Sequence, residues 1–404
     1  MHLALRQTPP RRSGRLVFVA VVLGFGAAWP ARAQHLEGGT ILFDSTVSEA
    51  SDDPGWVVVP FQHAYLQPPV VVMGPVSHSG VPQQPGEPSL SGRIRFVTTE
   101  GFEAAVQQPL SGGYAVDVKA DYIAMPQGAF LLADGTKLEA GLHTTAVVRS
   151  GHPAGLRDVG DLVFFRHAYG VEPAVFHTVQ TANSSEWITT IVFGDSRTQP
   201  PGAVFFQAAL EGAEAVPSHP QFGGPVAESI GWIAIEQIQG TIVDDTGAQR
   251  AIDVGNTWTR YVRSHDNGCY KLPDIGTLSG FTTPPWAVAS KISARGAEGG
   301  WLRRCYPNNN PTSDVTEAGF YVHTEEDQIQ DVERAGVQEH ASWLALAPGA
   351  SISLTAYGAS PNVNLRASGP DPLWPMDVLS YTISVVNVGI LPLPDVANIP
   401  ELVD

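Results

Sequence analysis

Basic residues are scarce in this chain of 404 residues, in which 23 lysines and arginines stand against 40 aspartates and glutamates, a formal net charge of −17. Five of the arginines lie before Gln34, in a segment that we expect to be removed, so the rest of the chain is more acidic still. A protein that binds nucleic acid or anionic lipid through a broad face needs a basic surface. We therefore expect no nucleic-acid partner and no electrostatic attachment to a membrane.

Long apolar runs are lacking too, apart from one near the N-terminus. A basic run is followed there by the apolar stretch Leu16–Trp29 and the small-residue pattern Ala31-Arg32-Ala33. This order is typical of a secretory signal peptide and predicts residues 1–33 as a leader cleaved after Ala33, with a retained N-terminal anchor as the alternative. We expect the mature chain to be exported through the periplasm, secreted or held at the cell surface, and not inserted into a membrane.

Only two cysteines are present, Cys269 and Cys305, 36 positions apart. In an oxidising compartment an even pair favours one disulfide, and the alternative is two buried free thiols. Such a disulfide would contribute about 3–4 kcal/mol by restricting the unfolded chain. Neither a CxxC pattern nor paired histidines accompany the cysteines, so we expect no metal site.

Motifs of the common enzyme classes are missing as well. The sequence contains no GxSxG elbow, HExxH helix, P-loop or GxGxxG turn. The block Ile191–Gln199 has a Gly-Asp-Ser step like that of certain esterases, but the Asp-x-x-His motif of those enzymes does not occur. No pair of acids is singled out for glycoside cleavage. We expect no enzyme and no cofactor, and an esterase or glycosidase is the least favoured class.

Two polar patterns have alternative interpretations. His63 and His167 share a His-Ala-Tyr context, and we expect both on the solvent-facing side of their segments rather than as catalytic or metal ligands. The acidic segment that begins at Glu325 and Glu326 lacks the EF-hand spacing, so a solvated loop is favoured over a calcium site. Apolar residues in Glu325–His340 are also too sparse for an amphipathic helix.

Convincing amphipathic helices are absent along the chain, and short runs rich in valine, isoleucine and aromatics predict strands. The stretch Phe61–Met73 returns as Phe165–His177 and, more divergently, as Phe281–Val288. From the second proline position of each copy, the chain runs 33, 33 and 35 residues to a phenylalanine and a further 22, 28 and 25 residues to the end of an aromatic-aliphatic-alanine step. The phenylalanines are Phe102, Phe206 and Phe320, and the steps begin at Tyr122, Trp232 and Trp343. Landmarks in register predict tandem repeats.

The repeats divide the chain into consecutive parts. Gly-Thr pairs near Gly39, Gly135 and Gly240 are expected to open the three copies, each a two-sheet antiparallel sandwich of about six strands. The predicted parts are a leader (1–33), repeat 1 (34–130), repeat 2 (131–238), repeat 3 (239–349) and a tail (350–404). Through the run Tyr381–Gly389, the tail resembles the opening strands of Ig-like repeats in bacterial surface proteins. We expect a degenerate stub, or a protein that continues beyond Asp404.

The core pattern resembles a known family. Phe61 and Tyr65 followed by Pro-Pro-Val-Val, the Gly101-Phe102 step and the run Ser229–Glu236 are similar to the signature of the H-type lectins, the snail-agglutinin and discoidin C-terminal kind. The resemblance covers residues 38–349 and implies a six-stranded antiparallel sandwich in each repeat. Members of the family form trimers with sugar sites near protomer boundaries, which implies that the repeats pack with pseudo-threefold symmetry. The signature also implies buried side chains at Phe61, Tyr65, Val70, Val72, Phe102 and Trp232.

The resemblance implies a sugar site made of an arginine near the start of the central strand and an aromatic-histidine pair beyond the phenylalanine of the Gly-Phe step. Repeats 1 and 2 do not recover these residues, since the arginine position of repeat 1 falls nearest Ser89, with Arg93 further along. Repeat 3 is richest in replacements that offer an apolar ring and paired polar groups. The candidate sugar ligands are Trp301, Arg303, Arg304, His323, Asp327 and Arg93. The alternative is that Trp301 is a core residue and that the arginines are solvated.

These observations favour a secreted or cell-surface protein that binds glycans or glycoconjugates non-covalently and mediates adhesion or agglutination. Each site is expected to be weak, with repetition supplying avidity. The alternative is a structural spacer or scaffold of a bacterial surface or pilus-associated protein that has kept the fold and lost the sugar sites. Self-association and further surface modules remain open as additional partners.

Overall fold

The computed structural model describes residues 34–47, 55–78, 89–108, 115–149, 159–184, 187–212, 226–257, 261–296, 300–307, 314–326, 334, 336–357, 362–367 and 381–386. Apart from one 3-10 turn, η1 (His265–Asn267), the regular structure in these ranges consists of β-strands that pair mainly antiparallel. The prediction of an all-β fold is confirmed. Within the same ranges, no helix is long and apolar enough to cross a membrane. The predicted leader lies outside the described residues.

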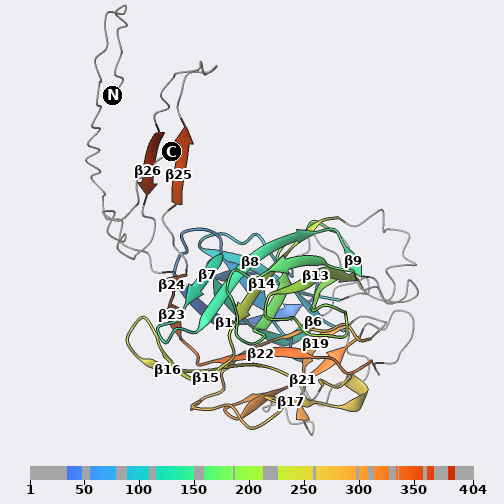
Figure 1. The fold of residues 1–404 in the computed structure, drawn as a ribbon. Coiled ribbons are helices and arrows are strands. Elements are labelled where there is room, and N and C mark those ends of the chain that lie inside the picture. The colour runs from blue at the N-terminus through green and yellow to red at the C-terminus, as the bar shows by residue number, and fades with distance from the viewer. Residues whose placement is uncertain are drawn as a thin grey trace, which may run out of the picture. The chain divides into compact units, whose positions relative to one another are not determined.

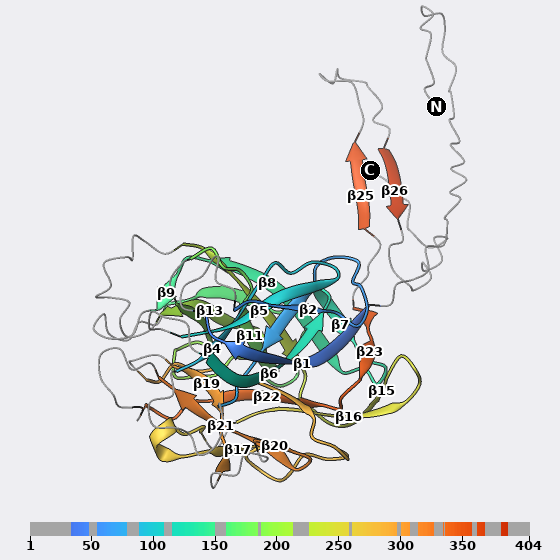
Figure 2. The same ribbon diagram turned by 180° about the vertical axis from the view of Figure 1, so that it is seen from behind.

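The three repeats form three units, and each unit contains one sheet that we call its inner sheet. In each inner sheet the first long strand of the repeat pairs with the last strand, which in turn pairs with a strand at the edge, all antiparallel. These strands are β1 (His35–Ser45), β6 (Ala115–Met125) and β3 (Val70–Met73) in unit 1; β8 (Lys137–Thr145), β14 (Glu228–Ile235) and β11 (Ala174–Val179) in unit 2; and β16 (Gln249–Asn256), β22 (Ala341–Leu346) and β18 (Trp286–Lys291) in unit 3. Figures 1 and 2 show them from opposite sides.

A smaller outer sheet accompanies each inner sheet, and its strand order also recurs. The outer strands are β2 (Val57–Pro60), β5 (Gly101–Gln107) and β4 (Ser91–Arg95) in unit 1; β10 (Asp161–Phe164), β13 (Phe205–Gly212) and β12 (Ile188–Phe193) in unit 2; and β17 (Tyr270–Leu272), β21 (Gly319–Glu325) and β19 (Trp301–Arg304) in unit 3. Short strands β9 (Val148–Arg149) and β20 (Val315–Thr316) pair with β13 and β21. Each unit is therefore a two-sheet sandwich.

A further strand borders each inner sheet, and its origin differs between the units. In units 2 and 3, β7 (Gly128–Leu131) and β15 (Ile238–Val243) precede the first strand and form hairpins with β8 and β16. In unit 1 the same place is taken by β23 (Ser351–Ser353), which pairs with β1 after the chain has passed through all three units. The end of the repeated region thus returns to its beginning.

This return corrects the predicted tail, which begins later than residue 350. After β23, strand β24 (Thr355–Ala356) pairs with β7. Ile352 and Leu354 are buried among apolar residues of the units, and their burial holds this segment to the sheets. The part of the tail described beyond it is a hairpin of β25 (Asn362–Ala367) and β26 (Tyr381–Val386).

The aromatic landmarks lie at equivalent places in the three inner sheets. Tyr122, Trp232 and Trp343 stand opposite Gly39, Gly141 and Gly255 on the first strands. A Cβ on these glycines would lie 2.6, 2.7 and 2.8 Å from the facing rings, so only glycine leaves room for the aromatic side chain. The expectation that Gly135 and Gly240 match Gly39 is therefore wrong, although the aromatic steps do correspond.

Each unit has its own hydrophobic core between its two sheets, and a fourth cluster joins side chains of all three units. Strand β3 shows why the sequence of an edge strand can be apolar throughout. Val71 and Met73 point into the core of unit 1, whereas Val70 and Val72 point into the shared cluster. Both faces of the strand are therefore buried. The side chains predicted to be buried from the family signature are all buried, as expected.

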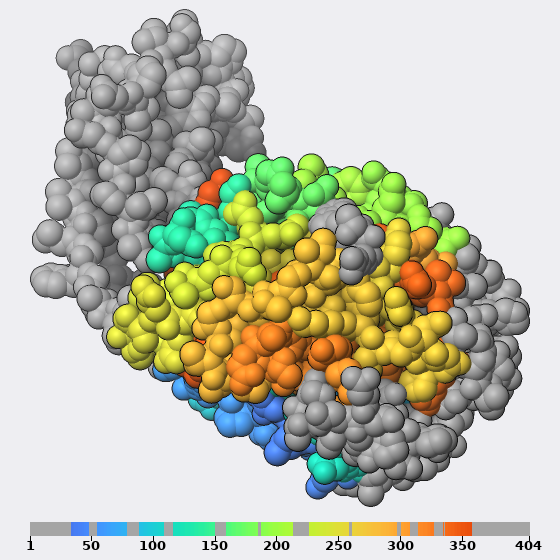
Figure 3. All heavy atoms as spheres, turned by 90° about the horizontal axis from the view of Figure 1, so that it is seen from below, coloured from blue at the N-terminus to red at the C-terminus, as the bar shows by residue number. Residues whose placement is uncertain are grey.

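The edge strands meet around the shared cluster, and each donates an N–H that its own sheet leaves unpaired. The register position of Val71 in β3 is that of Val175 in β11 and of Ala287 in β18. Their N–H groups bond Gln180 Oε1 at 3.1 Å, Ser342 Oγ at 2.9 Å and Asp121 Oδ2 at 2.8 Å, respectively. These bonds run from unit 1 to 2, from 2 to 3 and from 3 to 1, a cyclic order. Figure 3 shows unit 3 in yellow and orange between the green of unit 2 and the blue of unit 1.

The recurring Phe-x-His-Ala-Tyr stretch has a structural role. The first inner strand of units 1 and 2 carries a buried glutamate at the same register position, Glu37 and Glu139. Each glutamate accepts a hydrogen bond from a backbone N–H of this stretch. His63 is 54% exposed at its side chain, as expected, but His167 is buried and its Nε2 contacts the carbonyls of Phe130 and Leu138, both at 3.0 Å. The prediction that both histidines face solvent is thus wrong for His167.

Candidate functional site

Strand β19 carries three predicted ligands, and the structure buries all of them at the boundary between unit 3 and unit 1. Trp301 Nε1 donates a hydrogen bond to Leu90 O at 2.6 Å. The Trp301 ring also packs against Trp187 of unit 2, with ring centroids 4.8 Å apart. This indole has no open face for a sugar ring, in line with the alternative interpretation as a core residue.

Arg303 and Arg304 are neither open to a ligand nor solvated. Arg304 Nη2 donates to Asp121 Oδ2 at 2.5 Å and to Ala287 O at 2.7 Å. Arg303 Nη1 lies 3.4 Å from Glu325 Oε2, and its Nη2 donates to Ser77 O of unit 1 at 3.3 Å. The sequence pattern did not reveal this because a strand that faces a neighbouring unit can bury charges, provided that each is paired.

Arg93 is likewise buried and paired, at the boundary between units 1 and 2. It occupies on β4 the register position that Arg303 occupies on β19. Its Nη2 lies 2.7 Å from Glu228 Oε1 and 3.2 Å from Ser184 O of unit 2. Burial lowers the pKa of Arg93, and the charge of Glu228 opposes that shift. Arg93 therefore joins two units instead of facing solvent.

The remaining predictions fall in and around β21. His323 is buried, and Asp327 lies outside the described residues. Glu325 ends the strand and is fully buried beside Arg303, so the prediction of a solvated loop is wrong at that residue. Cys269 and Cys305 have Cα atoms 5.8 Å apart and form the expected disulfide.

An open groove of about 510 Å³ lies where units 1 and 2 meet. Unit 1 contributes the prolines before β3 and the chain that leaves β4, and unit 2 contributes the chain that leaves β11 together with parts of β8 and β14. The lining residues are Pro68, Pro69, Arg95, Phe96, Val97, Leu142, Gln180, Thr181, Ala182, Asn183 and Ser229. The groove combines an aromatic ring, apolar side chains and neutral polar groups.

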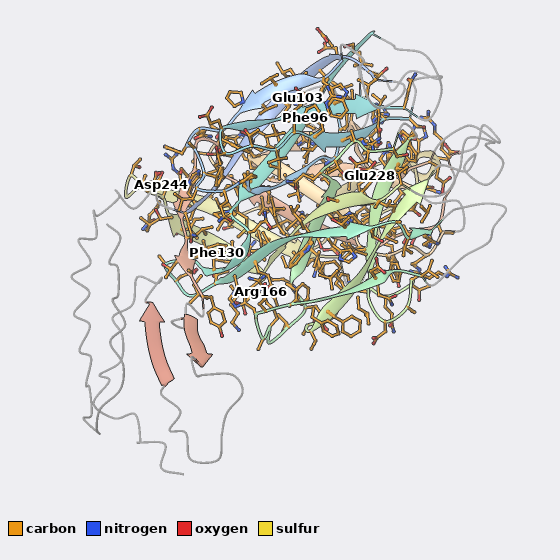
Figure 4. The ribbon with its side chains drawn as sticks, turned by 90° about the horizontal axis from the view of Figure 1, so that it is seen from above. Phe96, Glu103, Phe130, Arg166, Glu228 and Asp244 are labelled. Carbon is orange, nitrogen blue, oxygen red and sulfur yellow. A yellow bond between two sulfur atoms is a disulfide. The ribbon has the colours of Figure 1, made fainter. Side chains whose placement is uncertain are left out.

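Phe96 is the most unusual residue of the groove. Its side chain is 67% exposed, and its φ of 48° is in the left-handed region, which bulky residues rarely adopt. The Arg95 guanidinium lies 4.0 Å from the Trp56 ring centroid and 4.8 Å from that of Phe96. Arg95 Nε also donates to Glu103 Oε2 at 2.7 Å, and Phe96 and Glu103 lie next to each other in Figure 4. These contacts hold an aromatic face at the groove.

The opposite wall is held in place by Glu228, which is labelled in Figure 4. Its carboxylate accepts bonds from the Thr181 hydroxyl, from Asn183 N at 3.2 Å and from Ser184 N at 2.6 Å. Gln180 spans the boundary, because its Nε2 donates to Pro69 O at 3.0 Å. The side chain of Asn183, an exposed residue, donates to Ala227 O at 2.8 Å. The polar wall is therefore preorganised.

Another hollow, of about 430 Å³, lies on unit 2 between Glu172 and Phe205 and includes Asp195 of the Gly-Asp-Ser block. Ser196 of that block contacts the Thr198 hydroxyl at 3.1 Å. A nucleophilic serine needs a base within hydrogen-bond reach, and threonine is not one. This hollow thus gives no support to an esterase, and the groove at Phe96 is the better candidate site.

No family model matches the chain, and no match is found among the curated proteins or the solved structures. The geometry alone therefore carries the assignment. The groove sets an exposed ring beside amide and hydroxyl groups that are already held in place.

Proposed function

We propose that this protein is a secreted or cell-surface carbohydrate-binding protein, of the H-type lectin kind, that recognises glycans at the groove between units 1 and 2. The observation that carries the proposal is Phe96, an exposed aromatic residue kept in an unfavourable backbone conformation at the mouth of that groove. Strain of this sort is retained where a site requires it. The boundary between repeated units is also where the family resemblance implies sugar sites.

The groove offers the contacts that a sugar needs. The apolar face of a pyranose ring stacks on an aromatic side chain, and its hydroxyl groups bond to amide and hydroxyl groups around it. Phe96 would provide the stacking face, and Asn183 and Ser229 the polar contacts. The groove is shallow and open, so we expect a dissociation constant of about 1 mM for a monosaccharide, equivalent to about −4 kcal/mol. Adhesion or agglutination would then depend on several copies acting together.

A glycan array with the mature chain, followed by titration of the best ligand, tests this function. Phe96→Ala should weaken binding about tenfold or more, a loss of about 1.4 kcal/mol. Phe164→Ala is the matched control, because Phe164 is 62% exposed on β10, away from the groove. Equal affinity of the two variants, or no binding to any glycan by the wild-type chain, would overturn the proposal.

A structural scaffold is the second candidate function. The observation in its favour is that predicted sugar ligands, Arg93 and Arg304, pair across unit boundaries and so stabilise the assembly. In that case the groove would be a by-product of packing two units together. Absence of glycan binding combined with self-association of the mature chain in sedimentation experiments would favour this candidate.

A further inference from the structure

Three histidines gather at the boundary between units 3 and 1, although the equivalent positions elsewhere hold none. Strand register relates His323 on β21 to Ala209 on β13 and to Ala105 on β5. Counting from the matching edge strands, His78 after β3 corresponds to Ala182 after β11 and Ala294 after β18. His265 of η1 corresponds to Arg149 on β9 and to Val47. The fold does not require histidine at any of these positions.

The three imidazole rings are close together. The ring centroids of His78 and His323 are 5.2 Å apart, those of His265 and His323 are 5.0 Å apart, and those of His78 and His265 are 6.2 Å apart. Glu325 completes the group, and one ligand atom each from His78, His323 and Glu325 can be chosen so that all lie within 4.8 Å of one another. This is the spacing of donors that surround a single metal ion.

His323 is in ring contact with both other histidines of this cluster. It is fully buried, neither ring nitrogen has a hydrogen-bond partner, and Nε2 lies 3.6 Å from Glu325 Oε2, beyond hydrogen-bond distance. Burying ring nitrogens without a hydrogen bond is costly unless a ligand satisfies them.

The surroundings supply both charge and orientation. Arg303 and Arg334 each lie 3.4 Å from an oxygen of Glu325. Asp266 Oδ1 lies 2.9 Å from His265 Nδ1, and carboxylate–histidine pairs of this kind orient the imidazoles of metal sites.

We propose that His78, His323 and Glu325, with His265 as a further ligand, bind a divalent transition metal of the Zn²⁺ class across the boundary of units 3 and 1. Imidazole and carboxylate donors suit zinc, and three or four of them complete a tetrahedral site. The cysteines remain in their disulfide and do not coordinate the ion.

The location gives this site a role in closing the assembly. The chain runs directly from unit 1 into unit 2 and from unit 2 into unit 3, whereas it returns from unit 3 to unit 1 through β23, which pairs with β1. A metal held by His78 of unit 1 and by His323 and Glu325 of unit 3 would bridge the two units that the chain does not join in sequence. This inference does not depend on the proposed glycan site.

Metal binding is tested on the mature, oxidised chain after dialysis against ZnCl₂ and then against metal-free buffer. The expected result is about one zinc ion per chain, and Co²⁺ in its place should give visible bands of nitrogen and oxygen coordination. Zinc should also raise the unfolding temperature by a few degrees, because it binds only the folded chain. His78→Gln and His265→Gln each remove a proposed ligand while keeping the polarity and approximate volume of the side chain.

The control is His143→Gln, since His143 Nε2 also pairs with a carboxylate, Asp161 Oδ2 at 3.1 Å, but lies on β8. We expect His78→Gln to weaken zinc binding about 100-fold or more, since loss of even an outer-shell partner costs 10–100-fold. His143→Gln should retain wild-type affinity and the thermal shift. No retained zinc, equal affinity of His78→Gln and His143→Gln, or a thiolate-to-cobalt charge-transfer band would overturn the proposal.

Discussion

The boundary between units 2 and 3 and the boundary between units 3 and 1 bury a glutamate at the same register position but treat it differently. Glu211 lies 2.7 Å from Arg149 and 3.4 Å from Lys291. Glu325 has two arginines, each 3.4 Å away, and Nε2 of His323 at 3.6 Å. The first boundary is closed by one short ion pair, whereas the second holds its acid in a looser set of donors.

The difference shows how a duplicated fold acquires a site. The charge of a buried carboxylate must be neutralised by a nearby cation. One arginine can do this with two hydrogen bonds, which fix the carboxylate in place. Where Arg149 is replaced by His265 and the alanines by histidines, the same acid becomes part of a group that suits a metal.

Removing Arg149 should have the largest effect. Arg149→Met leaves Glu211 with only Lys291 and removes the hydrogen bonds that Arg149 donates to Ala294 O at 3.1 Å and to Gly296 O at 3.0 Å. Ala294 O keeps its bond from Arg197 Nη1 at 3.2 Å. We expect a loss of about 3–5 kcal/mol in the free energy of unfolding, measured by urea denaturation. The double variant with Glu211→Gln should recover part of this loss. A change below about 1 kcal/mol would show that the closed boundary does not depend on this ion pair.

Removing the acid at the looser boundary should cost less. Glu325→Gln keeps the shape but leaves Arg303 and Arg334 without their carboxylate, so we expect a loss of about 2–3 kcal/mol in urea denaturation without metal. The same variant should lose the thermal stabilisation by zinc. If Glu325→Gln is as harmful as Arg149→Met and still responds to zinc, the two boundaries do not differ in the way described.

Asp253 is a buried acid that, unlike Glu211 and Glu325, has no ion pair with a basic side chain among the described residues. Burial raises its pKa to about 6, against the bonds that it accepts. Because the folded pKa exceeds the unfolded value, the stability associated with Asp253 is greatest below about pH 4 and is lost as pH rises through 6. Asp253→Asn should therefore stabilise the protein by about 1–2 kcal/mol at pH 7.5 and by almost nothing at pH 4.

Urea denaturation at the two pH values measures this difference. Asp244→Asn is a control of opposite sign, because hydrogen bonds from Thr246 and Arg250 lower the pKa of Asp244. That variant should lose stability at pH 7.5. A gain for Asp253→Asn that is the same at both pH values would exclude titration of Asp253 as its cause.

The third boundary, between units 1 and 2, contains Phe96. The substitution Phe96→Gly should have the smallest effect on stability. Glycine adopts a φ of 48° without strain, so we expect a gain of about 1 kcal/mol in thermal unfolding, together with loss of glycan binding. A variant that is more stable and no longer binds would identify the strain at Phe96 as serving the groove. A variant that loses stability would contradict this.

The sequence predicted the parts of the fold that depend on local pattern. The apolar runs, the aromatic steps at Tyr122, Trp232 and Trp343 and the core residues keep their spacing because each copy repeats the same strands. The partner glycines were misassigned, because Gly-Thr pairs at Gly135 and Gly240 resemble Gly39 more closely in sequence than Gly141 and Gly255 do. Pairing across a sheet decides such matches, and a sequence does not contain it.

The candidate site was harder to predict because its elements lie on different units. Trp301 and Arg304 have the side chains that a sugar site needs, but a neighbouring unit covers them. The groove depends on Phe96, whose positive φ and exposure have no signature in the residue string. The adjacent Arg95, on the same strand as the candidate Arg93, was the nearest available signal. Likewise, His78 and His323 are far apart in sequence and meet only when unit 3 packs on unit 1.

The central claim is that the boundary of units 1 and 2 is a glycan site. Saturation-transfer NMR tests it most directly. The spectra are recorded with the glycan that binds best on the array, for the wild type, Phe96→Ala and Phe164→Ala. The account predicts strong transfer to the sugar for wild type and for Phe164→Ala, and near-complete loss for Phe96→Ala. Undiminished transfer in Phe96→Ala would contradict it.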